Sequence, residues 1–180
     1  QCLEGDDVWR ARDQGRFSAE LAEAACATVG TRQPGNMEDC DKPALFLLEH
    51  ADGLHSAALM LNGHVADWAY AARVDGQVQA TEFFLQPDGP GASFGYLRRN
   101  IQRFFQTGVS PYPTQRTLLT TGVIDAAMNS RYEDHRRLET PWLDITYESY
   151  DQLPERPLGE RPSGACLARN CPDLLLPWRQ

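Results

Sequence analysis

Three short turn sequences constrain the fold of this chain more than any other feature. They separate four runs of strand-forming residues, which are 44–50, 54–61, 65–74 and 77–85. The turns themselves are Asp52-Gly53, Asn62-Gly63-His64 and Asp75-Gly76. Glycine accepts the positive φ that a tight hairpin turn needs. Connections as short as these can join only antiparallel neighbouring strands. Residues 44–85 are therefore predicted to form an antiparallel meander.

Helical patterns flank this meander in the sequence. Residues 5–30 predict two short helices, of which the second is capped by the Ser18 hydroxyl. Residues 93–130 predict two longer helices, and residues 137–147 a strand that returns to the sheet. These elements predict an α+β fold with an open, mostly antiparallel sheet and helices packed on one face.

The longer helices carry clear signals at their ends and on one face. Ser93 and Thr114 are predicted to cap them, and Gly108 is the left-handed residue that ends the first. The second has small residues four apart on one row, namely Gly122, Ala126 and Ser130. Glycine inside a helix costs about 1 kcal/mol relative to alanine, so close packing of this row is the expected compensation.

The third strand run separates polar from aromatic side chains. Trp68 and Tyr70 fall on one side of it, and Asp67 and Arg73 fall on the other. With helices on one face of the sheet, the opposite face is left for a partner or a ligand.

Composition limits the classes of partner. The formal net charge is −8, and a chain this acidic is repelled by nucleic acid and by anionic membranes. No apolar run reaches the roughly 18 residues that span a bilayer. A soluble, cytoplasmic protein without a membrane or nucleic-acid partner is expected. The first residue is Gln1 rather than Met, which suggests a piece of a longer protein.

One domain is predicted over residues 1–150, followed by an extended Pro-rich tail over residues 151–180. The five cysteines form no C-x-x-C pair, which favours free cytosolic thiols over a disulfide framework. Cys166 and Cys171 in the tail are the one pair for which a disulfide or a metal site stays open. No metal site is expected elsewhere, because the histidines lack metal-ligand spacing.

The sequence contains one weak candidate for substrate binding. Asn62, His64 and Asp67 surround a predicted hairpin end, where polar side chains can converge. The competing interpretation is an ordinary turn with a capping asparagine, since residues three apart in a strand point to opposite faces. No local signature of a catalytic triad or a P-loop is present, and the catalytic residues stay unknown.

A glycine-rich segment, Gly89-Pro-Gly-Ala-Ser-Phe-Gly95, precedes the first long helix. A dinucleotide-binding turn needs a βαβ unit around such glycines, and here hairpins precede the helix and another helix follows it. No cofactor is therefore expected to bind this chain.

The run F-G-Y-L-R-R-N-I-Q-R-F-F-Q-T-G-V-S-P-Y-P-T-Q-R-T-L-L-T-T-G-V-I-D-A-A-M-N-S-R-Y-E-D-H-R-R-L-E-T-P resembles the C-terminal domain of the glucose-fructose oxidoreductase and inositol dehydrogenase (Gfo/Idh/MocA) family. The resemblance covers residues 93–146 and extends more loosely back to about Ala44. It implies a fold similar to the C-terminal domain of dihydrodipicolinate reductase.

The resemblance also implies a two-domain parent that oxidises or reduces a sugar-like or polyol-like alcohol. A missing N-terminal Rossmann domain would hold NAD or NADP, and the present chain would form the substrate side and, through its sheet face, a homo-oligomer. The family's E-K-P lysine belongs to that missing domain, so Lys42 in Asp41-Lys42-Pro43 does not take its role. The family's D-x-x-x-H pair has no counterpart, because Asp134 and His135 are adjacent.

Two hypotheses follow. The chain is either the substrate and oligomerisation domain of an NAD(P)-dependent oxidoreductase, inactive alone, or a non-catalytic binding or assembly module that uses its free sheet face.

Overall fold

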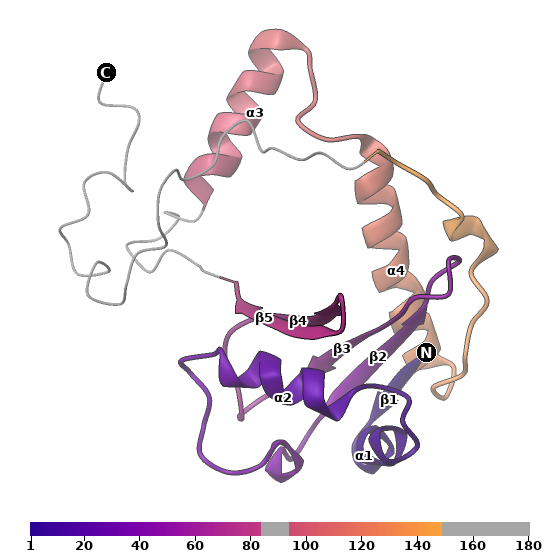
Figure 1. Cartoon of the computed structure of the whole chain (residues 1–180). Coiled ribbons are helices and arrows are strands. Elements are labelled where there is room, and N and C mark those ends of the chain that lie inside the picture. The colour runs from indigo at the N-terminus through magenta and orange to yellow at the C-terminus, as the bar shows by residue number, and fades with distance from the viewer. Residues whose placement is uncertain (84–93, 149–180) are drawn as a thin grey trace, which may run out of the picture. The chain divides into compact units, whose positions relative to one another are not determined.

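The computed structural model describes residues 1–83 and 94–148 (Figure 1). The chain divides into two compact units, one of residues 1–83 with 117–145 and one of residues 84–116 with 146–180. The predicted cap Ser93, most of the glycine-rich segment and the tail at 151–180 lie outside the described residues, and the domain boundary at residue 150 stays a prediction.

The first unit contains a three-stranded antiparallel sheet in the order β1-β2-β3. Its strands are β1 (Cys2–Glu4), β2 (Ala44–Glu49) and β3 (His55–Met60). The β2–β3 hairpin was predicted, and it is confirmed by pairing that runs from Ala44 opposite Met60 to Glu49 opposite His55. Strand β1 was not predicted, because three residues are too few for an alternating pattern to appear.

A separate two-stranded sheet follows, formed by β4 (Ala69–Val74) and β5 (Gln77–Glu82). The turn between them has positive φ at both central residues, 49° at Asp75 and 78° at Gly76. This is the arrangement of a type I′ turn, whose twist matches that of the paired strands. The predicted hairpin at Asp75-Gly76 is confirmed.

The prediction of one continuous meander is wrong between β3 and β4. Residues 61–68 form no strand, and the two hairpins belong to different sheets. In the turn that begins at Leu61, Gly63 has φ 91° and Asn62 is not among the residues of positive φ. Positive φ only at the second central residue is typical of a type II turn, which does not match the twist of a hairpin.

The prediction of a strand over residues 137–147 is also wrong. This segment contains only the 3₁₀ turn η3 (Pro141–Leu143). Proline at the first position of the turn has no N–H to donate to a ladder, and it restrains the residue before it. The place beside β2 is taken instead by β1, where Cys2 pairs with Phe46 and Glu4 with Ala44.

Two N-terminal helices cover apolar residues of the first unit. They are α1 (Asp6–Asp13) and α2 (Ala19–Ala27), and the predicted cap of α2 is confirmed by a hydrogen bond from Leu21 N–H to Ser18 Oγ (3.2 Å). Helix α1 buries Val8 and Ala11 against Leu3 and Leu45 of the sheet. Helix α2 packs on the β4–β5 hairpin.

Helix α4 (Thr114–Tyr132) carries the row of small residues. Close packing at Gly122 is confirmed, because a Cβ added there would lie 2.4 Å from a methyl carbon of Leu143. Ala126 and Ser130 are buried on the same row. The neighbour at Gly122 is the 3₁₀ turn η3, whereas Ser130 of the same row contacts strand β1 of the sheet at Cys2.

The described part of the second unit includes helix α3 (Gly95–Thr107), which ends at Gly108 with φ 70°. The predicted left-handed stop is thereby confirmed. Helices together with small antiparallel sheets make this an α+β structure, as predicted. No helix within residues 1–83 and 94–148 is long and apolar enough to cross a bilayer.

Candidate functional site

The three residues predicted to bind substrate lie in the connection between β3 and β4. Asn62 is exposed, His64 is buried with 4% of its surface exposed, and Asp67 is half-buried. Among the described residues, no hydrogen bond or ion pair joins their side chains to one another. The structure therefore places them in one segment without forming a polar pocket from them.

His64 is held by its backbone. Its N–H donates to Leu61 O (2.9 Å) and closes the turn, while its own carbonyl accepts from Gln33 N–H (2.7 Å). The Nε2 atom is buried and has no hydrogen-bond partner within the described ranges. A buried nitrogen left in this way costs about 1–3 kcal/mol. The sequence shows no signal of this burial, because the backbone bond to Gln33 joins segments far apart in the chain.

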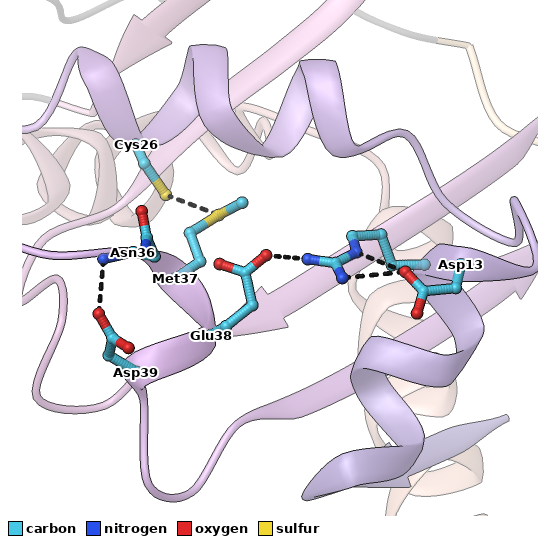
Figure 2. A network of polar contacts seen from close by, with 7 residues as sticks. Asp13, Cys26, Asn36, Met37, Glu38 and Asp39 are labelled. Carbon is cyan, nitrogen blue, oxygen red and sulfur yellow. Dashed lines mark hydrogen bonds and ion pairs between the residues drawn. The ribbon is translucent and has the colours of Figure 1, made fainter.

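The turn containing Asn62 rests on a sulfur-rich cluster. Cys26, Met37, Cys40 and Leu61 form one buried apolar cluster, which joins α2, the 3₁₀ turn η1 (Met37–Asp39) and the end of β3. The Cys40 thiol donates to the backbone carbonyl of Asn62 (3.3 Å). Cys26 Sγ lies 3.8 Å from Met37 Sδ, as Figure 2 shows.

Polar contacts hold the 3₁₀ turn η1 in place. Arg12 pairs with both Asp13 and Glu38, and so ties α1 to η1 (Figure 2). Asn36 N–H donates to Asp39 Oδ2 (2.8 Å), which completes a reciprocal cap of the turn. These bonds position the loop, so they serve structure.

The buried thiols are poor nucleophiles. Burial raises the pKa of Cys26, and burial together with the charge of Glu4 raises the pKa of Cys2. A raised pKa leaves less thiolate at neutral pH, and the thiolate is the reactive form. Neither cysteine has the electropositive, partly exposed environment of a catalytic cysteine.

A second polar cluster, which the sequence did not predict, joins the C-terminal end of α4 to β1. Ser130 Oγ accepts from Cys2 N–H (2.9 Å) and donates to Arg136 O (2.7 Å). Arg131 forms a two-pronged ion pair with Glu4, and His135 Nε2 lies 3.8 Å from the same carboxylate. Because these residues are more than 120 positions apart, no local pattern could have revealed them.

The most prominent surface feature of the first unit is the outer face of the β4–β5 hairpin. We call Trp68, Tyr70, Val74 and Phe83 the aromatic face. Trp68 is 60%, Tyr70 57% and Phe83 54% exposed. Phe83 N–H donates to Trp68 O (2.7 Å), which extends the hairpin by one pair and places these two residues side by side.

The opposite face of the hairpin is covered. Arg73, which points away from the aromatic face, pairs with Glu20 of α2. The sequence prediction that one face is covered by a helix and the other left open is confirmed for this hairpin. It is the alternation of side chains along β4 that made the two faces predictable.

The described residues form no cluster of metal-ligating side chains. Within residues 1–83 and 94–148 there is no group of three or more His, Cys, Asp and Glu side chains placed to hold a metal ion. Lys42 is exposed in the link between η1 and β2. Asp134 and His135 lie just after α4, with positive φ of 52° and 62°.

Comparisons with known proteins name no family for this chain. No family model matches it, and neither a curated protein nor a solved structure shows significant similarity.

Proposed function

We propose that this chain is a substrate and oligomerisation domain that works through contacts on its aromatic face. The observation that carries the proposal is the exposure of Trp68, Tyr70 and Phe83 on one side of a hairpin whose other side is covered by α2. Aromatic side chains are enriched at the centres of protein interfaces, and charged side chains are depleted there. The polar members of the same face, Gln77, Gln79 and Thr81, carry no charge.

A second copy of the chain is the partner we propose for this face. The aromatic face belongs to a two-stranded sheet, and two such faces can pack together about a twofold axis, so that the same patch is used on both copies. Charge does not oppose this arrangement at the centre of the patch.

Sedimentation analysis of the 180-residue chain over a range of concentrations tests self-association. Trp68→Ser is expected to raise the dissociation constant about tenfold or more, as for a central aromatic contact. Trp142→Ser is the matched control, because Trp142 is 59% exposed but lies on η3. A chain that stays monomeric, or equal effects of the two substitutions, would contradict the proposal.

As the finer part of this proposal, the parent protein is a cytoplasmic oxidoreductase that transfers a hydride between NAD or NADP and a sugar-like or polyol-like alcohol. The support is the resemblance of residues 93–146 to the Gfo/Idh/MocA family, together with the α+β architecture. The nucleotide would bind a Rossmann domain outside this sequence. The alternative is an assembly module with no oxidoreductase parent.

Titration of NADH and NADPH fluorescence separates these two possibilities. The 180-residue chain is expected to leave the fluorescence unchanged, and the full-length gene product is expected to bind one of the nucleotides. If the full-length product binds neither, the oxidoreductase part of the proposal fails while the assembly part stands.

A further inference from the structure

We propose that Asn62 is a site of spontaneous deamidation, and that its conversion to isoaspartate releases the buried thiol of Cys40. The reacting pair is Asn62-Gly63, which occupies the centre of the exposed turn after β3. Gly63 has no side chain to hinder approach of its backbone nitrogen to the side-chain amide of the preceding residue. This property of the turn is independent of the assembly function proposed above.

Asn62 differs from Asn36, Asn129 and Asp52 in how its side chain is held. Asn129 lies within α4 and its amide donates to Asp125 (3.2 Å), and the Asn36 side chain takes part in the cap of η1. At the Asp52-Gly53 turn, the Asp52 carboxylate accepts from Leu54 N–H (3.0 Å). Only backbone atoms of Asn62 take part in the hydrogen bonds of the described residues.

The reaction needs no reagent besides water. The backbone nitrogen of Gly63 attacks Cγ of Asn62, a Cγ–N bond forms, and the Cγ–Nδ2 bond breaks. The leaving Nδ2 amino group takes up the proton lost by the backbone amide and departs as ammonia. Water then opens the five-membered imide, either at Cγ to give aspartate or at the backbone carbonyl carbon to give isoaspartate.

The isoaspartate product changes the backbone, which is where this turn makes its contacts. In isoaspartate the chain runs through Cγ, so one more carbon lies between Leu61 and Gly63. The turn is closed by bonds from His64 N–H (2.9 Å) and Val65 N–H (3.1 Å) to Leu61 O, both of which span the insertion. The carbonyl that accepts the Cys40 thiol becomes a free carboxylate.

Formation of isoaspartate affects the buried cluster that contains Leu61 and Cys40. A carboxylate in place of the Asn62 carbonyl is drawn toward water, because an isolated charge is costly to bury. Leu61, which adjoins the modified residue, is itself a member of the cluster with Cys40. Formation of isoaspartate is therefore expected to open the cluster at Cys40, which is 8% exposed in the intact protein.

Incubation of the 180-residue chain at mildly alkaline pH, followed by peptide mapping, tests the reaction. Asn62 is expected to convert several-fold faster than Asn129 in the same sample. Asn62→Gln is the matched variant, because its longer side chain retains the amide but cyclises far more slowly. Equal rates of conversion at Asn62 and Asn129 would overturn the assignment of this site.

Alkylation of the folded protein tests the consequence. Cys40 is expected to react several-fold faster in aged than in fresh protein, while Cys2, which lies in β1 and is fully buried, keeps its rate. Asn62→Asp carries the new charge without the longer backbone and is expected to leave Cys40 protected. Unchanged Cys40 reactivity after isoaspartate has formed would refute the coupling between the two sites.

Discussion

Ser130→Ala tests whether the polar bridge between α4 and β1 holds the first unit together. Ser130 is 1% exposed, and its hydroxyl makes two hydrogen bonds to backbone groups of distant segments. Alanine fits the same space, so the substitution removes these bonds without introducing a clash. It leaves the N–H of Cys2, a fully buried residue, without its partner.

The expected loss of stability depends on what happens to the Cys2 N–H and the Arg136 carbonyl once Ser130 Oγ is removed. An unpaired buried N–H costs about 1–3 kcal/mol. The Arg136 carbonyl belongs to an exposed residue and can bond to water instead, so its loss adds little. Alanine is a better helix former than serine by about 0.5 kcal/mol, which offsets part of the cost. The net decrease in the free energy of unfolding is expected to be about 1.5 kcal/mol.

Urea unfolding followed by circular dichroism measures this difference. Asn129→Ala is the matched control at the neighbouring position, where the side chain is exposed, and it is expected to change stability by less than about 0.5 kcal/mol. Native-state alkylation of Cys2 gives a local readout, which should accelerate only in Ser130→Ala. A stability change of Ser130→Ala within the range of the control would refute the bridging role.

Two further predictions concern backbone conformation and pH. Gly108→Ala forces a residue with a Cβ into φ 70° and should lower the stability of the second unit by about 1–2 kcal/mol. The measurement is the temperature at which the helical circular-dichroism signal is lost, and Gly108→Asn is the milder control. Burial raises the pKa of Cys26, so folding favours the protonated thiol. The resulting contribution to the free energy of unfolding is complete below the ordinary thiol pKa of about 8.5, and it is lost as the pH rises above that value. Urea midpoints measured across that range should fall less steeply for Cys26→Ala, and identical slopes would contradict the assignment to this thiol.

The correct predictions from sequence are those that rest on neighbouring residues. The Ser18 cap, the Gly108 stop and the Asp75-Gly76 hairpin each depend on the conformation of a few consecutive residues, and the structure confirms all three. The row at Gly122 was predicted to pack closely for the same reason, since spacing along a helix fixes which residues share a face. Alternation along β4 likewise predicted which face carries Tyr70.

The incorrect predictions concern pairing between segments. A turn residue such as Gly63 fits both a hairpin and a type II turn, so local chemistry alone could not show that β3 and β4 belong to different sheets. Residues 137–147 have strand-forming side chains, but they include the 3₁₀ turn η3 and no strand forms. The third strand of the sheet comes from Cys2–Glu4, at the opposite end of the sequence.

For the candidate site, the same division holds between local and distant contacts. From sequence alone, aromatic residues were predicted to collect on one side of β4, because side-chain direction follows from spacing along a strand. Asp67, however, was predicted to lie in a strand and not in the connection that contains Asn62 and His64. Only the tertiary structure decided that His64 is buried, that Cys40 contacts the Asn62 carbonyl and that Ser130 joins α4 to β1. These contacts join residues between 22 and 128 positions apart, and their energies exist only once the segments have packed together.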